Sequence, residues 1–163
     1  MTNFGFEMAL NKLGIPFARA KVGDRYVMEK LQQVDGLIGG EASGHIICLD
    51  KTTTGDGIVA ALQVLAEIQQ SNSTLHDLRS AVIKYPQRLI NVRLKQMITL
   101  SDHPEIAEAV ADAEQQLADN GRVLLRPSGT EPVIRVMVEG RDATLTNQLA
   151  KQLAAVIENV INK

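Results

Sequence analysis

The first half of the chain combines helical spacing of apolar residues with short apolar runs that glycines interrupt. Apolar positions three or four residues apart predict amphipathic helices, and short runs bounded by turn residues predict strands. The pattern predicts helices over 4–13, 25–33, 57–68 and 74–83, and strands over 15–20, 37–39 and 46–49. The expected caps of these helices are Asn3, Asp24, either Thr54 or Asp56, and Ser73. The last two strands are close enough to form a hairpin with a glycine-rich tip.

The second half follows a different order of elements. Residues 89–95 alternate apolar and polar side chains, which is typical of a half-buried strand. A helix follows over 104–118, capped by Ser101 or Asp102. Two strands, over 122–126 and 133–138, come next, and the last element is a helix that is capped by Asp142 or Thr144 and ends near Ile161. This order predicts a small α+β domain with an antiparallel sheet.

Residues 84–88 separate these two patterns. The stretch has no periodicity and contains Pro86, so it is the candidate linker. We therefore expect one domain over 1–83, a linker over 84–88 and a second domain over 89–163.

Composition narrows the possible partners and compartments. The chain has 17 basic and 19 acidic residues and only 3% aromatic residues, without tryptophan, which argues against nucleic acid as a partner. A lone cysteine, Cys48, fits a reducing compartment. No apolar run reaches the roughly 20 residues of a membrane span, and residues 1–20 do not resemble a signal peptide. We expect a cytoplasmic protein without a membrane partner.

The most specific candidate for chemistry is the sequence Arg-Pro-Ser-Gly-Thr-Glu-Pro at 126–132. One loop between two strands carries a guanidinium and two hydroxyls, and Arg135 follows on the returning strand. Arginine forks, hydroxyl donors and free backbone N–H groups together suit a phosphate. A plain hairpin turn is the alternative, and Glu131 disfavours an anion unless it points away.

A second candidate is the expected hairpin tip, Gly-Gly-Glu-Ala-Ser-Gly-His at 39–45. The carboxylate of Glu41 can accept hydrogen bonds from two neighbouring sugar hydroxyls, and Ser43 can add another. His45 can donate to a phosphate or move a proton. Taken alone, the same residues also fit a flexible loop with a partly buried histidine.

Two further loops have simpler explanations. Lys21 and Arg25 flank Gly23 just before an expected helix, which suits either an anion or a solvated helix cap. The glycines at 55 and 57 match a dinucleotide-binding fingerprint only weakly, because the following helix does not lead to a second parallel strand. Helix capping explains that loop better.

No metal site or nucleophile is apparent in the sequence. The three histidines are far apart, and no cysteine joins them at a zinc-like spacing. An Asp-x-Asp-x-Asp run for magnesium and a Gly-x-Ser-x-Gly elbow are both absent. We therefore predict neither metal ligands nor catalytic residues in this chain.

Together these motifs resemble the α-D-phosphohexomutase superfamily, most closely its bacterial phosphoglucosamine mutase branch. The resemblance is carried by KVGDRYVMEKL at 21–31, GGEASGHIICLDKTTTGDGIVAALQVL at 39–65 and RPSGTEPVIRVMVEG at 126–140. Their order and spacing also fit, so the resemblance extends over essentially the whole chain.

The resemblance implies that residues 1–83 are most of a three-layer α/β/α domain three and residues 89–163 are domain four. It assigns sugar binding to Glu41, Ser43 and His45, and a substrate-facing loop to Gly23, Asp24 and Arg25. It assigns phosphate binding to the following residues: Arg126, Ser128, Gly129, Thr130 and Arg135.

The implied reaction interconverts glucosamine 6-phosphate and glucosamine 1-phosphate through a phosphoserine and a hexosamine bisphosphate. The serine and magnesium loops of the family belong to domains one and two, which have no counterpart in this sequence. We therefore expect a substrate-recognition portion that is inactive alone and works with domains one and two. A mutase of another hexose, a stand-alone sugar-phosphate binding module and an inert remnant remain alternatives.

Overall fold

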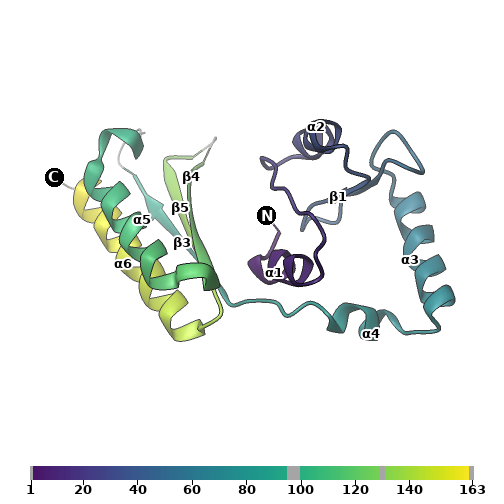
Figure 1. Cartoon of the computed structure of the whole chain (residues 1–163). Helices are drawn as coiled ribbons and strands as arrows, with labels where there is room; N and C mark the ends of the chain where they lie inside the picture. The colour runs from purple at the N-terminus through teal and green to yellow at the C-terminus, as the bar shows by residue number, and fades with distance from the viewer. Residues whose placement is uncertain (1, 95–99, 129–130, 162–163) are drawn as a thin grey trace. The chain divides into compact units, whose positions relative to one another are not determined.

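The computed structural model describes residues 2–94, 100–128 and 131–161 of the chain, which divide into two compact units, Met1–Ile83 and Lys84–Lys163. We call them unit 1 and unit 2 (Figure 1). None of the helices in the described ranges has the length and apolarity needed to cross a membrane.

Unit 1 contains four helices and a short hairpin. The helices are α1 (Phe4–Lys12), α2 (Asp24–Val34), α3 (Gly57–Ser71) and α4 (Leu75–Ser80). The strands β1 (Ile38–Gly40) and β2 (Ile46–Cys48) pair antiparallel, with Gly39 opposite Ile47. The hairpin and all four helices confirm the elements that the sequence predicted.

Capping groups explain where most of these helices begin. Asn3 accepts a hydrogen bond from the N–H of Gly5, and Asp56 accepts from Ile58 and Val59. Thr74, and not Ser73, caps α4 in a reciprocal capping box with Asp77. The predicted cap Asp24 was wrong, because Gly23 occupies the N-cap position and Asp24 is the first helical residue.

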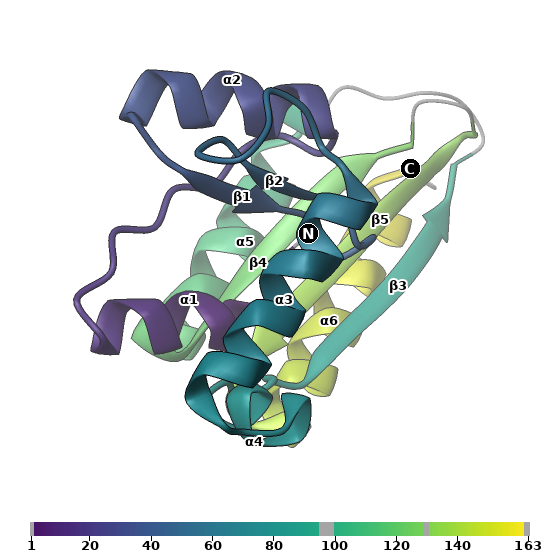
Figure 2. The ribbon, with the colours of Figure 1, turned by 90° about the vertical axis from the view of Figure 1, so that its right-hand side faces the viewer.

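Helix α2 lies against β1, and Figure 2 shows it beside the hairpin. A Cβ atom on Gly39 would lie 2.6 Å from Cγ1 of Val27, so only glycine permits this approach. The small core beside it is apolar: Leu31, Ile47 and Cys48 are buried.

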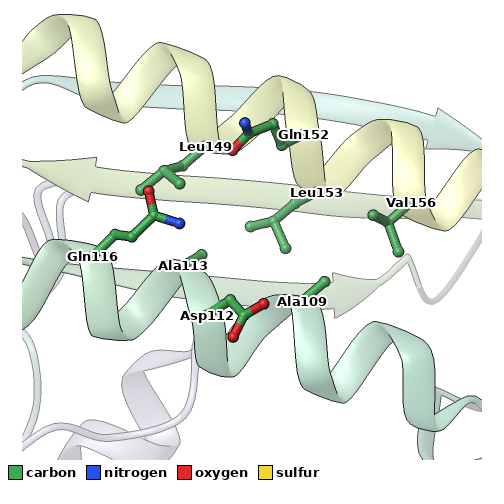
Figure 3. Close-up of a pocket in the computed structure, with 8 residues that line it drawn as sticks. All are labelled: Ala109, Asp112, Ala113, Gln116, Leu149, Gln152, Leu153 and Val156. Atoms are coloured by element: carbon green, nitrogen blue, oxygen red, sulfur yellow. The ribbon is translucent and has the colours of Figure 1, made fainter.

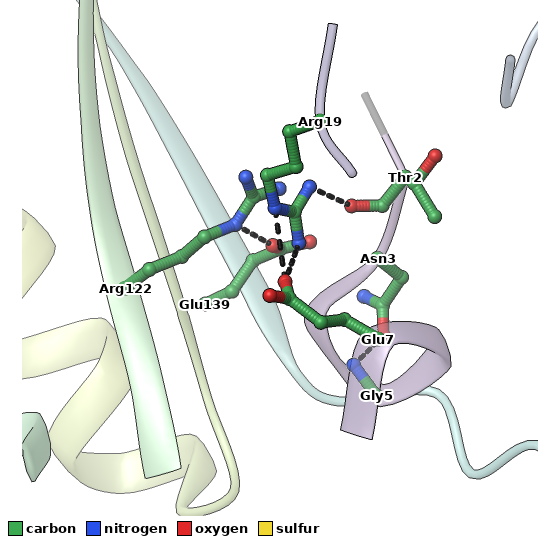
Figure 4. Close-up of polar contacts among 7 residues, drawn as sticks. All are labelled: Thr2, Asn3, Gly5, Glu7, Arg19, Arg122 and Glu139. Carbon is green, nitrogen blue, oxygen red and sulfur yellow. Dashed lines mark hydrogen bonds and ion pairs between the residues drawn. The ribbon is translucent and has the colours of Figure 1, made fainter. Parts of the chain in front are cut away.

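The strand predicted over 15–20 is absent, since these residues are irregular in the structure. Pro16 has no N–H to donate, and the side chain of Arg19 holds the segment against α1 instead. Arg19 pairs with Glu7 and donates to the carbonyl oxygen of Thr2 (Figure 4). A strand needs a neighbouring strand, and side-chain contacts alone leave the backbone irregular.

Unit 2 is a three-stranded antiparallel sheet covered on one face by two helices (Figure 1). The strands are β3 (Gln87–Arg93), β4 (Gly121–Pro127) and β5 (Val133–Gly140), with β5 in the centre. The helices are α5 (Pro104–Leu117) and α6 (Ala143–Ile161), and two 3-10 turns, η1 (Leu100–Asp102) and η2 (Ala118–Asn120), flank α5. The antiparallel sheet with two helices confirms the predicted fold class.

The core of unit 2 lies between the sheet and the helices. Val92, Ile134 and Val136 face it from the strands, and Leu153 and Ile157 face it from α6. The opposite face of the sheet carries polar residues, including the ion pair of Arg122 Nε with Glu139 Oε2 at 2.7 Å (Figure 4). The period-2 pattern of the sequence therefore identified the face that packs against the helices.

The ends of the elements in unit 2 differ slightly from the prediction. His103, and not Ser101 or Asp102, is the N-cap residue of α5. Asp142 accepts hydrogen bonds from the N–H groups of Thr144 and Leu145, so it caps α6 in preference to Thr144. Within the stretch 84–88, Tyr85 is buried, and Gln87 and Arg88 already belong to β3.

Candidate functional site

The loop before α2 and the tip of the hairpin are joined by one carboxylate. The N–H of Gly23 donates to Oε1 of Glu41 at 2.8 Å. Gly23 has φ +124°, a conformation that side-chain-bearing residues rarely adopt. Glycine at position 23 therefore permits both the positive φ of this loop and the hydrogen bond from its N–H to Glu41.

The hairpin tip is closed by its own backbone. Glu41 N–H donates to His45 O at 2.9 Å, and Gly44 N–H donates to Glu41 O at 3.0 Å. Gly44 has φ +96°, which explains a glycine at this position of the turn. The turn holds Glu41, Ser43 and His45 within five residues of chain.

Three polar side chains meet at this tip. Ser43 Oγ lies 2.8 Å from His45 Nδ1, and the same nitrogen lies 3.6 Å from Glu41 Oε2. The Glu41 side chain is 13% exposed, whereas that of His45 is 62% exposed. A shielded carboxylate beside two exposed donors or acceptors is suited to bind hydroxyl groups. The structure thus brings together Gly23, Glu41, Ser43 and His45.

Arg25 lies outside this group of contacts. Its Nε donates to Glu29 Oε1 at 2.9 Å, and its side chain is 81% exposed. This hydrogen bond holds the pKa of the Arg25 guanidinium above its ordinary value. Asp24 Oδ1 accepts from the N–H of Arg25 at 2.7 Å. Glu29 was not among the residues expected from the sequence, although an arginine and a glutamate four residues apart on a helix are an expected pair.

The two arginines of the predicted phosphate site lie side by side on neighbouring strands. Arg126 on β4 and Arg135 on β5 are direct partners in the antiparallel register. Neither guanidinium has an ion-pair partner among the residues that the structure describes. Like charges directly opposite each other destabilise a sheet, so this pair suits an anion bound between them.

Ser128 continues this row beyond the end of β4. Its N–H donates to Val133 O at 2.8 Å, which closes the loop, and the residue is buried. It lies two positions after Arg126, so both have the same parity along the strand. Gly129 and Thr130, which the sequence analysis included in the phosphate site, lie outside the described residues. Asn91 is opposite Arg135 on β3 and was missed, although its place in the alternating pattern was visible.

A cavity between α5 and α6 has different chemistry (Figure 3). Its volume is about 180 Å³, and Ala113 and Leu153 form part of its wall. Asp112 is the one ionisable group among the described residues that line it, alongside the amides of Gln116 and Gln152. The cavity offers no cation for a phosphate, so the loops remain the candidate site.

Metal ligands do not converge in the described parts of the chain. No three histidine, cysteine, aspartate or glutamate side chains in those ranges are grouped as a metal site.

Both units match models of known protein families. Residues 1–85 match the model described as phosphoglucomutase/phosphomannomutase, alpha/beta/alpha domain III. Residues 89–156 match the model of the C-terminal domain of the same group.

The chain is also similar to curated bacterial proteins. It is 61% identical over 154 residues to phosphoglucosamine mutase of Nitrosococcus oceani, covering 94% of this chain and 34% of the relative. It is 57% identical over 157 residues to phosphoglucosamine mutase of Methylococcus capsulatus, covering 96% of this chain and 35% of that relative. The chain spans about a third of the length of these relatives.

Solved structures share the fold at low sequence identity. N-acetylphosphoglucosamine mutase of Aspergillus fumigatus superposes with a TM-score of 0.78 at 19% identity, over 95% of this chain and 36% of that one. A structure of the same fungal enzyme with GlcNAc-6P and magnesium gives 0.74 at 18% identity, over 96% and 36%. With both of its units matched by the models of one family, this chain belongs to the phosphoglucomutase/phosphomannomutase family.

Proposed function

We propose that the chain is the substrate-recognition portion of a phosphoglucosamine mutase, the isomerase that interconverts glucosamine 6-phosphate and glucosamine 1-phosphate. The support is that the curated bacterial relatives are phosphoglucosamine mutases and that the chain matches about a third of their length. In this proposal residues 1–83 act as domain three and residues 89–163 as domain four, joined by 84–88. The lone, buried Cys48 fits a reducing compartment such as the cytoplasm.

The observation that carries the proposal is the cross-strand pair of Arg126 and Arg135, for which the described part of the chain supplies no ion-pair partner. Two guanidiniums on one face of a sheet can form charge-assisted, forked hydrogen bonds to phosphate oxygens. Ser128, together with Gly129 and Thr130, completes the proposed clamp. This clamp would hold the phosphate that is not reacting.

The proposed sugar site is the loop of Glu41, Ser43 and His45, with Gly23, Asp24 and Arg25 facing the substrate. A carboxylate that accepts from two neighbouring hydroxyls serves a hexose bound in either of two orientations. Such tolerance is needed because the two substrates of the proposed reaction carry phosphate at opposite ends of the sugar.

Phosphoryl transfer itself needs groups that the described residues do not supply. The transfer requires a phosphodonor in line with the acceptor and a cation to neutralise charge. In the proposed parent enzyme these are a phosphoserine and magnesium in domains one and two, with a hexosamine bisphosphate as primer. The role of this chain is then to bind and orient the sugar phosphate.

A calorimetric titration with glucosamine 6-phosphate tests the proposal. We expect Arg126→Ala to weaken binding by about 1.5–3 kcal/mol, the value of a charge-assisted hydrogen bond, or roughly ten- to 150-fold in Kd. Lys151→Ala is the control, because it removes an exposed cation from α6. Equal affinities for the two variants would contradict the assignment of the phosphate loop.

A further inference from the structure

Arg93, the last residue of β3, lies beside the two arginines of the proposed phosphate site. Strand β5 is the centre of the sheet, between β3 and β4 (Figure 2). Arg93 is opposite Val133 of β5, and Arg135 lies two positions further along that strand. Alternate residues of a strand point to the same face, so Arg93 shares the face of Arg126 and Arg135. Val92, which precedes it, belongs to the core on the other face.

The strand register places Arg93 and Ser128 on either side of Val133. On the β3 side Arg93 is its direct partner, and on the β4 side the N–H of Ser128 donates to Val133 O at 2.8 Å. Arg135 follows on β5, with Arg126 beside it on β4. Neighbouring strands are about 4.7–4.9 Å apart and diagonal neighbours about 7–8 Å, a distance that long side chains can span. An anion above Val133 is therefore within reach of all three guanidiniums.

The guanidinium of Arg93 is available to such an anion. The residue is exposed, and the described parts of the chain supply no ion-pair partner for it. Arg122 on the same face is different, because it is paired with Glu139. A row of apolar residues separates that pair from the other arginines: Leu89, Met137 and Leu124. The positive charge of this face is therefore concentrated at the end of the sheet where the phosphate loop begins.

The charge of the loop also favours a third arginine. Glu131 lies between β4 and β5, and its carbonyl oxygen accepts from the N–H of Val133 at 2.8 Å. The chain after β3 runs beside this loop, because the N–H of Leu94 donates to Pro132 O at 2.7 Å. Two arginines and this one carboxylate give a net charge of +1, whereas three arginines and the carboxylate give +2. A phosphate monoester carries about −1.5 to −2 at pH 7, so the set that includes Arg93 matches it better.

We propose that Arg93 is a third phosphate-binding arginine, which contacts the phosphate from the β3 side and offsets the charge of Glu131. The bound phosphate lies above Val133, between the guanidiniums of β3 and β4. The inference rests on the proposed function for the ligand, a phosphate monoester. It adds a residue of β3 to a site otherwise built from β4, β5 and the loop between them, and it explains how that loop tolerates a glutamate.

Calorimetric titration of the 163-residue chain with inorganic phosphate and with glucosamine 6-phosphate tests the inference. Arg93→Gln should raise Kd for both ligands at least about tenfold, because a charge-assisted hydrogen bond is lost. Arg88→Gln is the matched control, since it removes the same charge from the opposite face of the same strand, and it should change Kd less than about twofold. Arg93 is exposed on an edge strand, so both variants should keep the circular dichroism spectrum of the wild-type chain.

A double-mutant cycle tests the charge offset. Glu131→Gln alone should lower Kd for inorganic phosphate, because it removes a like charge from beside the anion. Added to Arg93→Gln, it should recover part of the lost affinity. An unchanged Kd in Glu131→Gln would refute the offset.

The inference would be overturned if Arg93→Gln bound both ligands as tightly as Arg88→Gln does, while Arg126→Ala still weakened binding. A failure of the proposed function gives a different result. The wild-type chain would then bind glucosamine 6-phosphate no more tightly than inorganic phosphate, with Arg93→Gln weakening the binding of both.

Discussion

At the scale of single residues, the proposed sugar site depends on one carboxylate with two neighbours. Glu41 accepts from Gly23 through one oxygen and lies near His45 through the other. It therefore connects the loop before α2 to the hairpin tip before any sugar is present. Such a prearranged contact lowers the cost of ordering both loops on binding.

We predict that Glu41→Ala lowers affinity for glucosamine 6-phosphate but leaves the affinity for inorganic phosphate unchanged. The carboxylate would contact sugar hydroxyls, whereas the arginines of unit 2 would contact phosphate. The expected loss is at least about tenfold, since one hydrogen bond to a charged group is worth about 1.5–3 kcal/mol. Calorimetry with both ligands measures it. A parallel loss of both affinities would mean that the loop has only a structural role.

At the scale of elements, side-chain caps determine where the helices begin. The reciprocal box of Thr74 and Asp77 begins α4, and Asp142 begins α6 through two backbone N–H groups. Thr and Asp at these positions satisfy N–H groups that the first helical turn leaves without partners. The effect of removing a cap can therefore be predicted and measured without a ligand.

We expect Asp142→Ala to lower the free energy of unfolding by about 1 kcal/mol, the usual value of an N-cap. Thr144→Ala is the control, because Thr144 contributes its backbone N–H to this cap and not its side chain. It should change stability by less than about 0.5 kcal/mol. Urea unfolding followed by circular dichroism compares the two variants. A larger effect for Thr144→Ala would contradict the observed cap.

The pKa of Asp77 should depend on Thr74. The hydrogen bond from the Thr74 side chain holds the pKa of the Asp77 carboxyl below its ordinary value, with the backbone N–H of Thr74 adding to it. A lowered pKa in the folded state stabilises α4 above the ordinary pKa, and this contribution is lost as the pH falls through the lowered pKa. Carboxyl NMR titration should show a higher pKa in Thr74→Ala. An unchanged pKa would rule out this hydrogen bond in solution.

At the scale of the whole molecule, the two units differ in how completely they bury their apolar residues. Unit 2 has one continuous core between its sheet and its helices. In unit 1 Ile58, Leu62 and Leu65 on α3 and Ile38 on β1 remain exposed. Unit 2 therefore meets the usual condition for independent folding, whereas unit 1 is expected to gain stability from a partner.

The chain by itself should not convert glucosamine 1-phosphate to glucosamine 6-phosphate, even with magnesium and a bisphosphate primer. The described residues present no group of metal ligands, and Ser43 and Ser128 lie in the proposed binding loops. A coupled assay of the purified chain measures turnover, with a preparation carrying both Ser128→Ala and Arg126→Ala as the blank. Appreciable turnover above that blank would overturn the proposed division of roles. Addition of the remaining two thirds of a relative should restore some activity.

The sequence by itself determined the elements that depend on local patterns. Periodicity located the helices, the hairpin and the antiparallel strands of unit 2, because the spacing of apolar residues reports which side is buried. Loop chemistry also singled out Glu41, Ser43 and His45 as neighbours, since they lie within five residues of one another.

Only the tertiary structure decided features that depend on residues distant in the sequence. The apolar run 15–20 looked like a strand but has no neighbouring strand, and Arg19 holds it to α1 instead. The contact of Gly23 with Glu41 and the pairing of Arg126 with Arg135 depend on turn geometry and strand register. A strand is stable only in a sheet, and a shift of one residue in register would exchange its faces. Local spacing carries no information about which distant backbone supplies the partner.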